Sequence, residues 1–136
     1  MNTNCTKIDR NSPEYLDYLS IAKNIFSNDS ISEYTCFVDV DTPYFEVRGR
    51  PYFDNCDYTL LQYDCEFIYV PQKLIYDGNR IFPAKTNTNN LATTTDDLLS
   101  YYKPSKELFT EKCYYLLHLI KEMQNKLRME NIKYDF

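Results

Sequence analysis

The sequence is poor in glycine, alanine and histidine, and it has no tryptophan. Its 136 residues include two glycines, three alanines and one histidine. Two scattered glycines cannot form the glycine-rich loop that cradles a phosphate, so nucleotide binding of the common kinds is disfavoured. The lone His118 follows Cys113 by five residues, a spacing that points the two side chains apart on a helix. We therefore expect His118 at the edge of an apolar helix face rather than in a catalytic pair.

Long apolar runs are also missing. The longest are only a few residues, whereas a helix needs about 20 apolar residues to cross a bilayer. The N-terminus lacks the apolar region of a signal peptide, so we expect an intracellular, cytoplasmic protein with no membrane contact. The five cysteines are odd in number, irregularly spaced and free of C-x-x-C pairs, which predicts reduced thiols rather than zinc ligands. No metal or organic cofactor is expected.

Aromatic residues are abundant: the chain has 14 tyrosines and eight phenylalanines. A disordered chain would have few aromatic and β-branched residues, so we expect a folded domain. Asn, Lys, Ile, Tyr and Phe, which A/T-rich codons encode, are common, whereas Gly and Ala are scarce. This bias indicates an A/T-rich genome, such as that of a large DNA virus, a mobile element, a low-GC bacterium or a protist.

Periodicity predicts one α+β domain over residues 1–136. Ser12 as a cap and Pro13 at the first helical position predict a helix over 12–28. Alternation of apolar and polar residues predicts a β region over 33–82, with strands Tyr34–Asp41, Tyr44–Arg48 and Tyr58–Val70. A hairpin over Lys73–Phe82, turning at Asp77-Gly78, follows. We expect a mostly antiparallel sheet of about four to five strands.

The C-terminal part of the chain is expected to be helical. A loop over 83–95 precedes C-terminal helices within 95–130: a short one over Asp96–Lys103 and a long amphipathic one from Ser105. The long helix has an a/d seam formed by Phe109, Cys113, Leu116, Ile120, Met123 and Leu127. Three further leucines widen this apolar face, which favours packing on the sheet. A homodimer through the seam is the alternative.

Charge is unevenly distributed along the chain. Residues 1–70 carry twelve acidic and five basic residues, whereas the remainder is slightly basic and the whole chain has a net charge of −5. A net acidic chain repels phosphate backbones, so nucleic-acid binding is disfavoured. Acids in the β half are interleaved with tyrosine, a residue enriched at protein interfaces. The pattern favours a protein partner, and a basic one.

Eight acidic and aromatic residues of the β half form the candidate binding surface: Asp39, Asp41, Tyr44, Glu46, Tyr52, Asp54, Asp64 and Glu66. Asp39 and Asp41 share one face of their expected strand, and Asp64 and Glu66 share one face of theirs. If those strands pair, four carboxylates lie close together, an arrangement that Mg²⁺ prefers. A solvated polar sheet face and a metal site both stay open as alternatives.

The sequence thus predicts a small, non-enzymatic accessory factor that binds a protein. An inhibitor or a counter-defence protein of an A/T-rich virus or mobile element fits this pattern. Two alternatives from other classes remain. One is a structural or assembly subunit that uses the seam of the C-terminal helix, and the other is a metal-dependent hydrolase or nuclease that uses the strand carboxylates.

Overall fold

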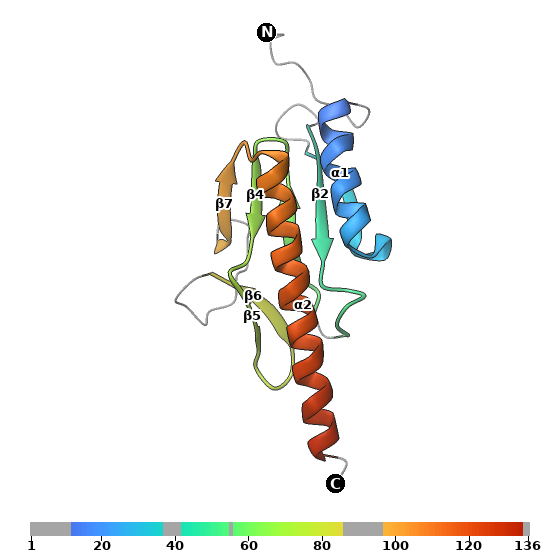
Figure 1. Ribbon diagram of the computed structural model, residues 1–136, viewed down its shortest axis with the longest axis vertical. Coiled ribbons are helices and arrows are strands. Elements are labelled where there is room, and N and C mark those ends of the chain that lie inside the picture. The colour runs from blue at the N-terminus through green and yellow to red at the C-terminus, as the bar shows by residue number, and fades with distance from the viewer. Residues whose placement is uncertain (1–11, 37–41, 55, 86–96, 135–136) are drawn as a thin grey trace.

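The computed structural model describes residues 12–36, 42–54, 56–85 and 97–134 and has the expected α+β architecture (Figure 1). Residues 37–41 of the expected strand Tyr34–Asp41 and most of the loop expected at 83–95 lie outside these residues. In chain order, the elements are α1 (Pro13–Ile25), the 3-10 turn η1 (Asn28–Ser30), β1 (Ile31–Cys36), β2 (Thr42–Arg48), β3 (Thr59–Tyr63), β4 (Phe67–Val70), β5 (Lys73–Tyr76), β6 (Ile81–Ala84), β7 (Leu99–Tyr102) and α2 (Lys106–Tyr134).

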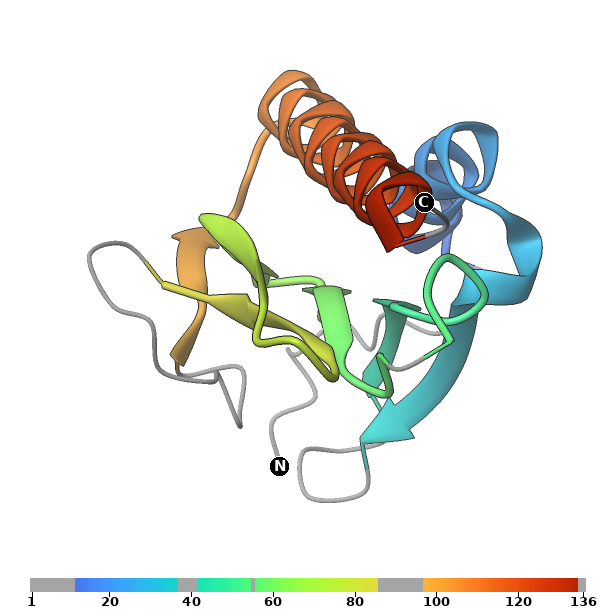
Figure 2. The same cartoon turned by 90° about the horizontal axis from the view of Figure 1, so that it is seen from below.

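Five strands form one antiparallel sheet in the order β1-β2-β3-β4-β7. The hairpin β5–β6 is a separate two-stranded sheet beside α2. Both helices lie on the same side of the five-stranded sheet, as Figure 2 shows. We call the side of the sheet under the helices the covered face, and the opposite side the open face.

The two helices begin where their caps predict. Ser12 precedes α1 with Pro13 in its first turn. The Ser12 side chain makes no capping hydrogen bond, but its carbonyl accepts one from the Leu16 amide at 3.0 Å. At the start of α2, the Ser105 hydroxyl accepts a hydrogen bond from the Leu108 amide at 3.0 Å. The prediction for α1 was therefore right to within a few residues at its end, and α2 runs further than expected.

The seam of α2 packs on the covered face, as the width of its apolar stripe predicts. Its first five residues are buried: Phe109, Cys113, Leu116, Ile120 and Met123. They join one core cluster with residues of α1 and the sheet. Because these side chains are already buried within one chain, the seam is not exposed for a coiled coil with a second copy.

The segment Tyr58–Val70 is two strands rather than the one long strand expected. Tyr63 ends β3 and Phe67 begins β4, and the two strands pair as a hairpin. The Asp64 carboxylate accepts hydrogen bonds from the amides of Glu66 at 3.0 Å and Phe67 at 2.7 Å. An aspartate side chain that bonds to the backbone two and three residues later is a turn-forming device, and Cys65 takes a φ of 78°.

The expected short helix over Asp96–Lys103 is also wrong where the structure describes it. Leu99–Tyr102 forms β7, which pairs with β4 at the edge of the sheet. Leu99 and Tyr101 face the core cluster, and the alternate residues face away. Four residues pairing with an existing strand satisfy their backbone groups along that side, which outweighs local helix preference.

The two glycines serve different backbone requirements. Gly78 turns the hairpin β5–β6 with a φ of 94°, and there is open space where a β-carbon would lie. Gly49 follows β2 and lies against Cys56: a β-carbon on Gly49 would be 2.7 Å from Cys56 Cβ and 2.8 Å from the Cys56 carbonyl oxygen. Gly78 is thus needed for its left-handed backbone conformation, and Gly49 for a close approach of two backbones.

We predict that Gly49→Ala destabilises the protein more than Gly78→Ala. Gly49→Ala pushes the backbone at residue 49 away from that at Cys56 and should lower the free energy of unfolding by about 3 kcal/mol. Gly78→Ala adds only backbone strain and should lower it by about 1 kcal/mol. Urea denaturation measures both free energies of unfolding. An equal or smaller effect of Gly49→Ala would show that the contact with Cys56 relaxes easily.

Candidate functional site

The structure does not bring the six candidate residues that it describes together on one surface. Asp39 and Asp41 lie outside the described residues. The other six divide into three groups: Tyr44 and Glu46 on β2, Tyr52 and Asp54 between β2 and β3, and Asp64 and Glu66 in the β3–β4 turn. Each group has a different environment.

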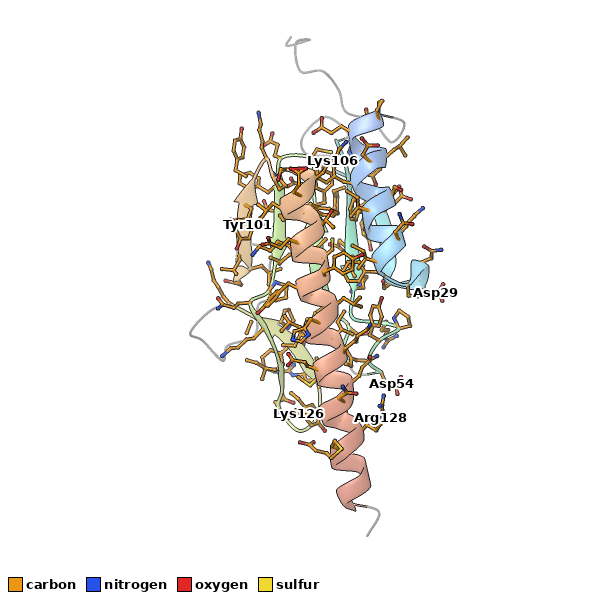
Figure 3. The ribbon with its side chains drawn as sticks, viewed as in Figure 1. Asp29, Asp54, Tyr101, Lys106, Lys126 and Arg128 are labelled. Carbon is orange, nitrogen blue, oxygen red and sulfur yellow. The ribbon has the colours of Figure 1, made fainter. Side chains whose placement is uncertain are left out.

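Tyr52 and Asp54 lie beside the C-terminal half of α2. They line an open cavity of about 450 Å³, to which the hairpin β5–β6 and α2 also contribute. Asp54 and Arg128 appear on the same side of the lower part of α2 in Figure 3 and both line this cavity. The Tyr52 hydroxyl accepts a hydrogen bond from the Ser27 amide at 2.7 Å, which fixes the loop against the end of α1.

Asp64 and Glu66 lie near the opposite end of α2. The Glu66 carbonyl accepts a hydrogen bond from the Lys103 amide, just before α2 begins. Along α2, the distance from Lys106 to Arg128 is about 30 Å at the usual rise per residue. Asp64 and Asp54 therefore cannot act on the same small ligand, and the Asp64 carboxylate is engaged by backbone amides in its turn.

Tyr44 and Glu46 lie on the open face, where aromatic side chains gather. Strand alternation places Phe45 and Val47 in the core and their neighbours on the opposite side. The same alternation, carried across the sheet by the strand registers, defines the open-face residues. They include Tyr34, Tyr44, Glu46, Arg48, Gln62, Phe67, Tyr69, Ser100 and Tyr102.

The open-face rings contact one another in two groups. Tyr34 stacks on Tyr44 with ring centroids 5.2 Å apart. Phe67 contacts Tyr69 at 5.7 Å and Tyr102 at 5.1 Å. Tyr102 is 60% exposed, a large fraction for an aromatic residue in a strand. Such ring pairs stabilise a sheet across neighbouring strands and also present a large contact area.

The described part of the open face is not acidic, in contrast to expectation. Glu46 forms an ion pair with Arg48 at 3.1 Å, so the two charges cancel locally. Arg48 also donates to the Asp57 carbonyl at 2.5 Å. At the other side of the face, the Lys103 ammonium lies 5.3 Å from the centre of the Tyr102 ring. The surface is therefore aromatic, with a few paired charges.

A second feature, which the sequence did not reveal, is a cavity of about 430 Å³ at the end of the sheet. It lies between the start of α1, the β3–β4 turn and the connection from β7 to α2. Glu14, Tyr18, Tyr63, Cys65, Glu66, Lys103 and Pro104 line it. We call it the Tyr63 cavity. Residues far apart in the sequence form it, so no local motif could have indicated it.

The Tyr63 hydroxyl is buried and has no hydrogen-bond partner among the described residues. The residue is only 1% exposed. Burial raises its pKa well above the usual tyrosine value, and the neighbouring Cys65 thiol and Glu14 carboxylate raise it further. The hydroxyl is therefore neutral at every physiological pH. An unsatisfied buried polar group costs free energy and calls for an explanation.

The buried thiols are poor candidates for catalysis. Cys56, Cys65 and Cys113 are free and buried. Burial raises the pKa of all three, that of Cys65 to about 12. Nucleophilic cysteines need the opposite shift, because the thiolate is the reactive form.

The described ranges contain neither a metal-binding cluster nor a membrane-spanning helix. No group of three His, Cys, Asp or Glu side chains there could hold a metal ion. His118 is exposed and lies 3.3 Å from Glu122 on the same helix. None of the helices in these ranges is long and apolar enough to cross a bilayer.

Comparisons of this chain with protein-family models, curated proteins and solved structures find no match. A functional proposal therefore depends on the geometry of the described residues.

We predict that Tyr63→Phe leaves the protein at least as stable as the wild type. The substitution removes only a hydroxyl that has no partner in the described structure, which should stabilise the fold by about 1 kcal/mol. Thermal unfolding of Tyr63→Phe measures this, and Tyr18→Phe is the matched control, because the Tyr18 hydroxyl donates to the Pro104 carbonyl at 2.6 Å. A loss of stability in Tyr63→Phe equal to that in Tyr18→Phe would mean that the Tyr63 hydroxyl is satisfied.

Proposed function

We propose that this protein is a non-enzymatic binding protein and that its open face contacts a basic segment of another protein. The proposal is carried by one observation: aromatic rings from β1, β2, β4 and β7 share the face of the sheet that lies opposite both described helices. Apolar and aromatic side chains on an accessible face are typical of interaction surfaces.

Aromatic rings are suited to the arginine and lysine side chains of a basic partner. The face of a tyrosine ring attracts a cation that lies within about 6 Å. Rings of this protein already hold its own cations in this way, with Lys103 over Tyr102 and Lys112 over Tyr101. The net charge of −5 adds a long-range attraction that favours a basic partner.

The alternatives from other classes have less support in the geometry. A hydrolase that uses Asp64 would need a carboxylate already engaged in capping its own turn. Assembly through the seam of α2 would need residues that are buried in the core. The amino-acid composition, rich in residues that A/T-rich codons encode, supports the narrower proposal of a viral or mobile-element accessory factor, and it identifies no partner.

Selection of a random peptide library on the immobilised protein tests the proposal. We expect enriched peptides to contain arginine or lysine, because these side chains complement the rings and the net charge. The variant Phe67→Thr/Tyr102→Thr keeps strand preference but removes two contacting rings. It should weaken binding of the enriched peptides about tenfold or more, as measured by fluorescence anisotropy.

Tyr114→Ala is the control, since Tyr114 on α2 is 58% exposed, close to the 60% of Tyr102. It should leave peptide binding unchanged. Peptides without basic residues, or equal losses in the control and in the open-face variant, would contradict the proposal. Oligo(dT) and oligo(U) are titrated in parallel, because tight binding that follows the same two rings would indicate a single-stranded nucleic acid instead.

A further inference from the structure

The strand β7 ends the five-stranded sheet and is its outermost strand in Figure 1. It pairs with β4 on one side, and no described strand pairs with it on the other. An end strand presents unpaired N–H and carbonyl groups, to which an extended segment of another chain can bond. The side chains beside β7 determine which segment that is.

Alternation along β7 shows which backbone groups point away from the sheet. In an antiparallel pair, residues that exchange backbone hydrogen bonds alternate with residues that do not. The Lys103 amide donates to the Glu66 carbonyl, one step beyond the register of β4 and β7. The backbone groups of Tyr101 therefore also face β4, and those of Ser100 and Tyr102 face outward.

The hairpin β3–β4 supports the same assignment independently. The Asp64 amide donates to the Phe67 carbonyl at 3.2 Å, so the backbone groups of Phe67 face β3. Those of the next residue, Ile68, then face β7, and Ile68 is the register partner of Tyr101. The residues on either side of Tyr101 thus present their N–H and carbonyl groups outward, where no described backbone group bonds to them.

The open-face side of this edge suits basic residues. Ser100 and Tyr102 belong to the open face, and Tyr102 is 60% exposed. A residue directly opposite either one in an added strand has its side chain on the same face. A lysine or arginine there would lie beside the Tyr102 ring, which attracts a cation. The net charge of −5 adds to this attraction.

The covered-face side of the same edge has a pocket of about 210 Å³, which we call the β7 pocket. The residues that line it include Val70, Pro71, Leu99, Tyr101, Lys112 and Tyr115. The Tyr115 hydroxyl already donates to the Gln72 carbonyl at 2.6 Å, and the Lys112 ammonium lies 4.9 Å from the centre of the Tyr101 ring. The Lys112 charge disfavours a second cation, so the β7 pocket suits an aliphatic side chain.

We infer that the basic partner binds as an added antiparallel strand along β7, with lysine or arginine side chains on the open face and an aliphatic side chain between them in the β7 pocket. Every strand pair of the five-stranded sheet is antiparallel, so the added strand continues the pattern. Backbone hydrogen bonds supply affinity, and the alternate side chains supply specificity. The inference rests on the proposed function, which supplies the basic partner.

Titration with the peptide acetyl-Lys-Val-Lys-Val-Lys-amide, followed by amide hydrogen exchange in nuclear magnetic resonance, tests the inference. In the free protein the amides of Ser100 and Tyr102 should exchange quickly and that of Tyr101 slowly, because only Tyr101 donates to β4. Near saturation, the peptide should slow exchange at Ser100 and Tyr102 about tenfold. Protection of both amides in the free protein, or unchanged exchange with peptide bound, would overturn the inference.

Backbone N-methylation of this peptide gives a matched pair of probes. In the expected alignment the lysine amides face β7 and the valine amides face away. Methylation of the central lysine amide should weaken binding about tenfold, whereas methylation of one valine amide should have little effect. The isomer acetyl-Lys-Lys-Lys-Val-Val-amide has the same charge without alternation and should bind more weakly. Equal affinities within either pair of peptides would contradict strand addition.

Ser100→Pro tests the protein side of the contact. Proline is tolerated in an edge strand where its missing N–H would face solvent, so the bonds to β4 should persist. The substitution should weaken binding of the alternating peptide about tenfold. Ser100→Thr is the control, since it changes the same side chain, keeps the N–H and should bind as the wild type does.

The variant Phe67→Thr/Tyr102→Thr separates this inference from the proposed function. If it weakens peptide binding while Ser100→Pro and lysine N-methylation do not, the open face binds the peptide and strand addition is overturned. If Ser100→Pro and lysine N-methylation weaken binding while the loss of both rings does not, strand addition is supported and the proposed role of the rings fails.

Discussion

The packing of Phe109 against the rings of the covered face is the contact on which the rest of the structure depends. Phe109 is fully buried, and its ring lies 5.1 Å from Tyr18, 6.1 Å from Phe45 and 5.7 Å from Tyr63. These contacts join α2 to α1 and to the strands β2 and β3, which carry Phe45 and Tyr63. Once both helices occupy this face, strand alternation places most residues of the sheet either under a helix or on the open face. Leu60 is an exception, because it and its neighbour Leu61 are both buried.

The Asp64 turn decides which face of the sheet the rings of β4 reach. In β3 the odd-numbered Leu61 and Tyr63 face the core, whereas in β4 the even-numbered Ile68 and Val70 do so. A continuous strand over these residues would have placed Phe67 on the same side as Tyr63. The turn reverses this alternation, so the rings of β4 lie on the open face. The same turn brings Cys65 and Glu66 to the Tyr63 cavity.

The sequence was sufficient for elements with strong local signals. The starts of both helices were predicted from Ser12 with Pro13 and from Ser105 before a wide apolar stripe. The β5–β6 turn was predicted from Gly78. The β3–β4 turn was missed because it has no glycine or proline; Asp64 was the available signal. The strand β7 forms by pairing with β4, and the Tyr63 cavity is formed by three segments distant in the sequence. Neither could therefore be predicted from a local sequence pattern.

The central claim is that the rings form a buried set around Phe109 and an accessible set on the open face, with the Asp64 turn placing the rings of β4 in the second set. Hydroxyl-radical footprinting with mass spectrometry measures this directly, because oxidation follows the solvent exposure of each side chain. The account predicts rapid oxidation of Phe67 and Tyr102 and slow oxidation of Tyr63 and Phe109. Protection of Phe67 and Tyr102 equal to that of Tyr63, in dilute protein, would contradict it.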